Sequence, residues 1–313
     1  MTGKRTQTRH GFTLVELLVV IVIIAILASL VVVGVSRAQV AARNAAIKME
    51  ISEIAKALEA YKNDMGEYPP DFAYDPTVIT DPASVILFKR QQINQHLSRK
   101  FRNRRPDPMA APPTAMLVQL DYLSDTQVAQ LNPQTALYFW LRGFSPDPRK
   151  PITGAGNRTP IFQFDQARLT ESATTTGNTD FPPYPPQYGQ TPIGLVYYRA
   201  KRGPTIDKTV ALGASATYGD ATAWANAQIT AGQKAVIPYI SDLMNSVYVQ
   251  DESYQIISAG LNSEFGVGGA SYPSGVYPAN HPITTVQGQP LSVNERDNIT
   301  NFLKGASLEK DVP

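Results

Sequence analysis

The feature that most constrains this chain is an apolar stretch from Gly11 to Val35, which directly follows the short basic segment MTGKRTQTRH. Between Phe12 and Val35 the one ionisable side chain is that of Glu16. A bilayer core about 30 Å thick requires roughly 20 apolar residues in a helix, and this stretch supplies them. The sequence therefore predicts a membrane-spanning helix at the N-terminus.

Three kinds of N-terminal segment share this outline: a cleaved secretory signal, a signal anchor and a prepilin leader. A secretory signal has a shorter apolar core that ends in a small-residue cleavage site, whereas this β-branched run continues without one. The residues at the junction of the basic and apolar segments distinguish the other two. There the sequence G-F-T-L-V-E-L-L runs without a gap from Gly11 to Leu18.

With this junction the N-terminus resembles the type IV prepilin family, which includes the pseudopilins of type II secretion. The resemblance implies that prepilin peptidase cuts after Gly11 and methylates the new amino terminus on Phe12. It also implies that Glu16 pairs with the terminal amine of a neighbouring subunit during assembly. A carboxylate inside hydrocarbon is costly and usually marks a function. The alternative is that Glu16 lies at headgroup level, where its carboxylate remains hydrated.

Charge predicts the orientation in the membrane. Positive residues that flank a first helix stay in the cytoplasm, so the three leader cations Lys4, Arg5 and Arg9 place the head in the periplasm of a single-pass inner-membrane protein. The net charge of +2 becomes −1 when these three cations are removed, so overall charge argues neither for nor against a nucleic-acid partner, and no such partner is expected. Because the chain has no cysteine, packing or a metal must close the C-terminal end of the head.

Beyond the membrane the helix is expected to continue to about residue 62. Apolar residues recur at spacings of three and four from Ile47 to Tyr61, with charged residues between them, which is typical of an amphipathic helix. Gly66 and the following prolines predict its end, and this junction also resembles that of the pseudopilins. We therefore expect a cleaved leader at 1–11, a helix at 12–63 and a single globular head at 64–313.

A basic segment interrupts the start of the head. Asp81 and Pro82 predict the first turn of a helix, and the stretch that ends at Pro106 contains seven cations and no acid. Such a run can bind DNA phosphates or an acidic membrane surface. We favour the alternative, a solvated helix face whose charges aid solubility or meet acids on the next subunit. The cations are Lys89, Arg90, Arg99, Lys100, Arg102, Arg104 and Arg105.

The rest of the head combines short helices with short strands. Helices are expected at 114–123 and 134–142, and the second of these contains the apolar ALYFWL, which predicts core packing. Strands of one antiparallel sheet are expected at 160–164, 193–199, 235–240 and 254–258, with a long polar loop at 170–190. The predicted fold is α+β and pilin-like: a long N-terminal helix packed on an antiparallel sheet, enlarged by helical insertions.

The C-terminal segments YQIISAGLNSEFG and RDNITNF resemble the calcium-binding end of the major type II pseudopilin head. Calcium takes six to eight oxygen ligands, which include carboxylates, amides and main-chain carbonyls. The chain departs from the family at Asn262, where an aspartate is usual, and through the insert from Gly266 to Gly288. The alternative is that these residues only form turns and helix caps. The candidate ligands are Asn262, Asp297 and Asn298 through side chains, and Ala259 and Ser263 through carbonyls.

No enzymatic activity is expected. The three histidines have no metal-ligand spacing, and the chain has neither a cysteine nucleophile nor a G-x-S-x-G or P-loop motif. The resemblance implies a structural subunit of a type II secretion pseudopilus, which assembles with other pseudopilins on an inner-membrane platform. Two alternatives stay open: a type IV pilin for adhesion, motility or DNA uptake, and a membrane-anchored enzyme or binding protein.

Overall fold

The computed structural model describes residues 14–104, 120–200, 218–231, 236–242, 247–265 and 297–302. The chain divides into two compact units, residues 1–43 and 44–313. The helix α1 (Leu14–Met65) contributes to both units, and its second half belongs to the head. The boundaries predicted for the leader and for the head remain predictions.

The second half of α1 is the central element of the head. Its predicted apolar stripe is fully buried, because residues at these spacings share one face of the helix. The helix ends at Gly66, which adopts the left-handed φ of 86° and donates its N–H to the carbonyl of Lys62 at 2.7 Å. Both the helix and the place where it ends are confirmed. The stripe consists of Ile47, Ile51, Ile54, Leu58 and Tyr61.

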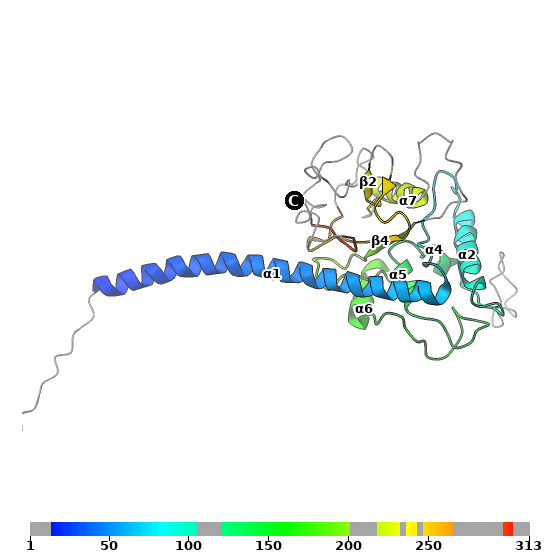
Figure 1. Cartoon of the computed structure of the whole chain (residues 1–313), viewed down its shortest axis with the longest axis horizontal. Coiled ribbons are helices and arrows are strands. Elements are labelled where there is room, and N and C mark those ends of the chain that lie inside the picture. The colour runs from blue at the N-terminus through cyan, green and yellow to red at the C-terminus, as the bar shows by residue number, and fades with distance from the viewer. Residues whose placement is uncertain are drawn as a thin grey trace, which may run out of the picture. The chain divides into compact units, whose positions relative to one another are not determined.

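The described residues between 82 and 176 contain four shorter helices: α2 (Pro82–Ser98), α4 (Asp125–Ala129), α5 (Ala136–Leu141) and α6 (Gln166–Thr176). Figure 1 shows the second half of α1 passing α5 and α6, with α2 beside its C-terminal end. The predicted start of α2 is confirmed, since Asp81 Oδ1 accepts the N–H of Ser84 at 2.8 Å. The predicted core role of ALYFWL is also confirmed, because Trp140 is fully buried and its Nε1 donates to the Pro70 carbonyl at 2.9 Å.

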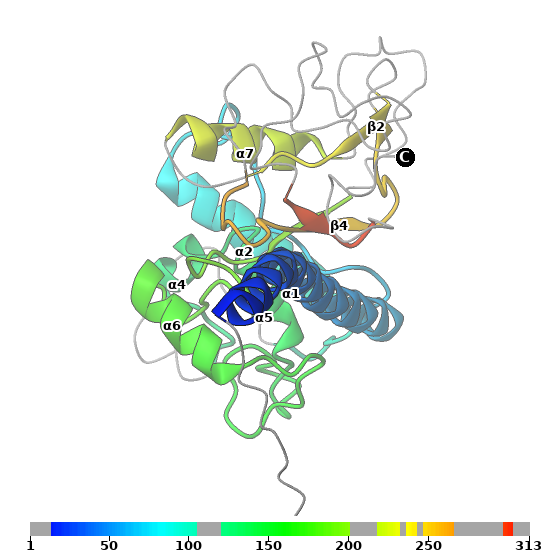
Figure 2. The ribbon, with the colours of Figure 1, turned by 90° about the vertical axis from the view of Figure 1, so that its left-hand side faces the viewer.

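An antiparallel sheet of β1 (Val196–Arg199), β4 (Tyr254–Ser258) and β5 (Ile299–Thr300) separates two apolar cores. Val196 pairs with Ile257, and Ile257 pairs with Thr300. Because side chains alternate along a strand, Tyr197 joins the core around α1, whereas Tyr198 joins the core beneath α7 (Gly219–Thr230). Figure 2 shows β4 between α1 and α7. The α+β class is confirmed.

The expectation of one sheet that includes 160–164 and 235–240 is wrong. Residues 160–164 form no strand, because Ile161 and Phe162 donate their N–H groups to the Leu141 carbonyl at the end of α5, at 2.9 and 3.2 Å. Of the described residues 236–240, only Ile240 lies in a strand. This strand, β2 (Ile240–Asp242), pairs with β3 (Val247–Tyr248) as a second sheet.

Two helix boundaries also differ from expectation. Helix α6 occupies the start of the predicted 170–190 loop, because Asp165 caps its first turn and Gly177 ends it with a φ of 71°. In the predicted 114–123 helix, residues 120–123 are not helical and the others lie outside the described residues. The chain instead enters α4 at Ser124, which forms a capping box with Gln127.

Candidate assembly site on the N-terminal helix

The first half of α1 carries a long apolar surface. From Leu14 to Val35 the described apolar side chains are mostly exposed, and the leucine at the start is 79% exposed. Within the described residues, α1 is the one helix long and apolar enough to cross a membrane. So large an apolar surface requires lipid or other apolar helices around it.

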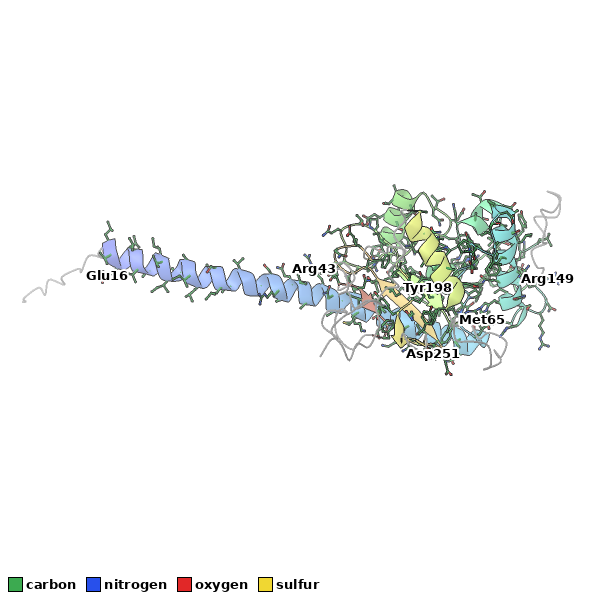
Figure 3. The ribbon with its side chains drawn as sticks, turned by 90° about the horizontal axis from the view of Figure 1, so that it is seen from above. Glu16, Arg43, Met65, Arg149, Tyr198 and Asp251 are labelled. Carbon is green, nitrogen blue, oxygen red and sulfur yellow. The ribbon has the colours of Figure 1, made fainter. Side chains whose placement is uncertain are left out.

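Glu16 lies in the first turn of α1, where its side chain projects from this apolar helix (Figure 3). The N-terminal end of a helix carries a partial positive charge, which favours a carboxylate in the first turn. Other polar groups of this half are satisfied within the helix: Ser29 Oγ donates to the Ile26 carbonyl at 2.7 Å, and Ser36 Oγ to that of Val32 at 3.0 Å. Glu16 is the one ionisable group of the apolar stretch, so its carboxylate would lose hydration if α1 packed among apolar helices. Gly11 and Phe12 lie outside the described residues.

Part of the basic segment differs from the solvated face that the sequence indicates. Lys89 and Arg90 are each only 3% exposed. Lys89 Nζ donates to the Ala129 carbonyl at 3.0 Å, and burial lowers the pKa of Lys89 to about 8. Arg90 Nη2 donates to the Leu123 carbonyl at 2.7 Å and pairs with Asp125 at 2.7 Å. These two cations attach α2 to α4.

Arg104 is likewise a structural residue. Its Nε pairs with Asp121 Oδ2 at 2.6 Å, and both side chains are buried. The other oxygen of Asp121 accepts the N–H of Thr153 at 2.8 Å and that of Ile152 at 3.1 Å. Sequence reasoning missed this carboxylate, because its partners lie in two distant segments.

The remaining described cations lie nearer the surface. Arg99 pairs with Glu67 at 3.0 Å, Lys100 pairs with Asp64, and Arg102 is exposed. Arg105 lies outside the described residues. The expectation of a solvated face is thus wrong for the three buried cations, which form contacts within the head.

The C-terminal segments singled out as a calcium site do meet in the structure. Asp297 Oδ2 accepts the N–H groups of Leu261 at 2.7 Å and Asn262 at 3.1 Å. Asn262 Oδ1 accepts the N–H of Glu264 at 2.8 Å, and Ser263 Oγ accepts that of Gln190 at 2.7 Å. The side chains therefore hold backbone groups, in the manner of turns.

Asn298 lies deeper and is fully buried. Its Nδ2 donates to the Tyr239 hydroxyl at 2.8 Å, and its Oδ1 has no hydrogen-bond partner among the described residues. The described chain contains no group of three or more His, Cys, Asp or Glu side chains placed to hold a metal. A single carboxylate that already accepts two N–H groups fits calcium poorly, since calcium takes six to eight oxygens. Calcium binding stays a prediction.

Comparison with known proteins agrees with the geometry of α1. Residues 6–32 match the family model described as the prokaryotic N-terminal methylation motif. The chain is 39% identical over 79 residues to the type II secretion system core protein G of Klebsiella michiganensis, which covers 25% of this chain and 56% of that protein. It is 48% identical over 63 residues to the core protein G of Pseudomonas aeruginosa, covering 20% and 44%.

The chain spans about half the length of these curated relatives. No solved structure matches it. The apolar helix, the methylation motif and these relatives together make the N-terminal part of the chain similar to type IV prepilins and to the type II secretion core protein G.

Proposed function

We propose that this chain is a structural pseudopilin subunit of a type II secretion system. The observation that carries the proposal is the exposed apolar half of α1, most of which lies within the matched N-terminal methylation motif. Such a helix can lie in lipid as a monomer and pack against the same helix of other subunits in a polymer. The proposal assigns the chain no catalytic step.

Processing comes first in this proposal. Prepilin peptidase removes the leader after Gly11 and methylates Phe12. The leader cations keep the N-terminus in the cytoplasm, and the head stands in the periplasm as part of a single-pass protein. Cleavage leaves a charged amine at the membrane end of α1.

Assembly then brings charges together. When α1 enters a bundle of apolar helices, Glu16 loses hydration and needs a positive partner. The terminal amine of a neighbouring subunit, delivered by the inner-membrane assembly platform, supplies that partner. A buried charge without its partner is strongly unfavourable. A subunit at the wrong axial offset would leave both charges unpaired, so the pair favours the correct offset.

The first experiment examines the N-terminus by mass spectrometry of the full chain from cells with and without prepilin peptidase. We expect a peptide that begins at methylated Phe12 in the first cells and an intact leader in the second. Gly11→Leu, which changes the residue before the cut and leaves α1 intact, should also retain its leader. An intact wild-type leader beside active peptidase contradicts the proposal.

The alternative within the same architecture is a type IV pilin for adhesion, motility or DNA uptake. Both relatives are named as type II secretion core proteins, which favours secretion. Deleting the gene distinguishes the two, because loss of a pseudopilin leaves exported proteins in the periplasm. Loss of surface filaments with normal secretion supports the pilin instead.

A further inference from the structure

A pocket of about 570 Å³ lies in the head among the end of α1, the turn that follows it, the second half of α2 and the end of β1. This volume falls in the range of small-molecule sites, which is about 300–1,000 Å³. Charged side chains dominate its wall, and the assembly role of the N-terminal half of α1 uses none of them. They are Lys62, Arg99 and Arg199, with the carboxylates of Glu67 and Glu252.

The inner wall is built on His96, whose side chain is 1% exposed. His96 Nδ1 lies 2.7 Å from Glu67 Oε1, and its Nε2 lies 2.8 Å from the Tyr61 hydroxyl. Because a carboxylate only accepts, Nδ1 carries the proton and Nε2 accepts from Tyr61. Burial lowers the pKa of His96, so the ring is neutral at pH 7. This arrangement holds Glu67 in place in the pocket wall.

Glu67 is ionised and already shared. Burial raises its pKa, but the hydrogen bond from His96 and the charges of Arg199 and Arg99 outweigh burial and hold the pKa below its usual value. Oε2 pairs with Arg99 Nη1 at 3.0 Å, and Oε1 lies 3.8 Å from Arg199 Nη1. One carboxylate therefore partly neutralises two guanidinium groups.

Glu67 does not use all of the positive charge and hydrogen-bond donors of the pocket wall. The side chain of Arg99 is 58% exposed, and within the described chain only its Nη1 forms an ion pair. Lys62 Nζ donates to the Tyr68 hydroxyl at 3.2 Å, which occupies one of its three protons. Three cations face two carboxylates in this wall, so the pocket carries a net positive charge.

We propose that this pocket binds a small ligand that carries carboxylates. The planar fork of Arg99 suits a carboxylate in two-point contact, and the ammonium of Lys62 provides a second positive contact. Glu67 competes with the ligand for Arg99, and its negative charge repels the ligand's carboxylates. Glu67 therefore weakens ligand binding, although its ion pair holds the Arg99 guanidinium in place. This site is independent of the proposed assembly through α1.

Calorimetric titration of the full chain in detergent tests the proposal with two probes, citrate and an amidated hexaglutamate peptide. Binding of citrate supports the proposal. Binding of the peptide without citrate overturns it, because the pocket would then take carboxylates of a protein rather than a small ligand. Arg99→Gln should weaken the binding about fivefold or more. Arg102→Gln, an exposed cation of the same segment outside the pocket, is the matched control and should leave affinity unchanged. Equal weakening by both variants, or binding of neither probe, overturns the proposal.

Glu67→Gln gives a change of opposite sign. The amide oxygen still accepts the proton of His96 Nδ1, while the negative charge beside Arg99 disappears. We expect about fivefold tighter binding, and a melting temperature measured without ligand shows whether the head remains folded. Weaker or unchanged binding to a folded Glu67→Gln protein overturns the proposal, because removal of a carboxylate that competes for Arg99 should tighten the binding of another carboxylate.

Discussion

Asp297 accepts the backbone N–H of Leu261 at 2.7 Å across 36 positions of sequence. The same oxygen accepts the N–H of Asn262 at 3.1 Å, and Gly260 lies so close that a Cβ there would be 2.2 Å from the Asp297 carbonyl oxygen. These contacts join the start of β5 to the turn after β4. In a chain without cysteine, this carboxylate attaches the last described strand to the loop beside it.

Asp297→Ala should destabilise the head by about 1–3 kcal/mol, because two N–H groups lose a charged acceptor. Asp297→Asn keeps an oxygen acceptor and should cost less. Thermal melting of the full chain in detergent, with millimolar calcium or with a chelator, measures both effects. We expect the same loss in both conditions, since the contacts need no metal. A wild-type melting temperature that calcium raises, together with no such rise in Asp297→Ala, would establish the calcium site instead.

The buried cations of α2 give a second prediction. Arg90→Ala should destabilise the head by about 2 kcal/mol, because the Leu123 carbonyl and Asp125 lose a charged donor. Arg102→Ala, in an exposed position, should change stability little. Chemical denaturation followed by tryptophan fluorescence measures both variants, since Trp140 is fully buried. Equal stability of the two variants would show that the contact between α2 and α4 contributes nothing.

The same contacts predict weak DNA binding. Lys89, Arg90 and Arg104 are committed to partners inside the head, so three of the seven cations of the basic segment cannot reach phosphates. We expect the full chain to show little retention on DNA at physiological salt. Strong retention that falls steeply with salt would favour the DNA-uptake alternative.

Local signals made α1 and α2 predictable. The stripe from Ile47 to Tyr61 is visible in the spacing, and Gly66 and Asp81 act through groups within four residues of themselves. Local sequence does not predict the conformation of residues 160–164. Two of their backbone N–H groups donate to the Leu141 carbonyl, which lies outside the segment. β5 has two residues and is too short for a periodic pattern.

The sites divide in the same way. Glu16 stands out in the sequence because it interrupts an apolar run, and the methylation motif is continuous. Arg90 and Arg104 pair with Asp125 and Asp121, which are remote in sequence. The charge of the basic segment alone therefore predicted a solvated face and missed these buried ion pairs. The pocket wall draws residues from four separate segments, and no local pattern brings them together.

A fourth prediction concerns acid stability. The pKa of His96 is lowered by burial from 6.5, so the folded head binds fewer protons at this ring than the unfolded chain does. Stability therefore rises with pH, and it falls as pH drops below about 6.5, where the unfolded ring becomes protonated. The lowered pKa of Glu67 extends the loss to lower pH, below the ordinary value of 4.5.

His96→Gln removes the first part of this dependence. Melting temperatures of the full chain between pH 5 and pH 8 should fall with acid in the wild type and change less in the variant. Glu252→Gln, which changes an exposed carboxylate outside the His96 contacts, is a matched control and should follow the wild type. Identical slopes for wild type and His96→Gln would show that the ring does not control stability in this range.

The last prediction tests Glu16. Glu16→Val removes the one ionisable group of the apolar stretch, so membrane insertion should be unchanged or slightly more favourable. Assembly should fail, because in the proposed polymer the methylated amine of a neighbouring subunit would then enter the helix bundle without a negative partner. Glu16→Gln keeps the size of the side chain and removes its charge, and it should fail in the same way if charge pairing is the cause.

Membrane fractionation measures insertion, and cross-linked oligomers together with exported protein in the medium measure assembly. Glu16→Asp, which keeps the charge on a shorter side chain, is the conservative control and should retain part of the wild-type output. Leu17→Val changes the neighbouring apolar residue and should secrete normally, which separates a specific role of the carboxylate from general damage to α1. Normal secretion by Glu16→Val and Glu16→Gln would remove the ion pair from the mechanism, because the polymer would then form through apolar packing of α1 alone.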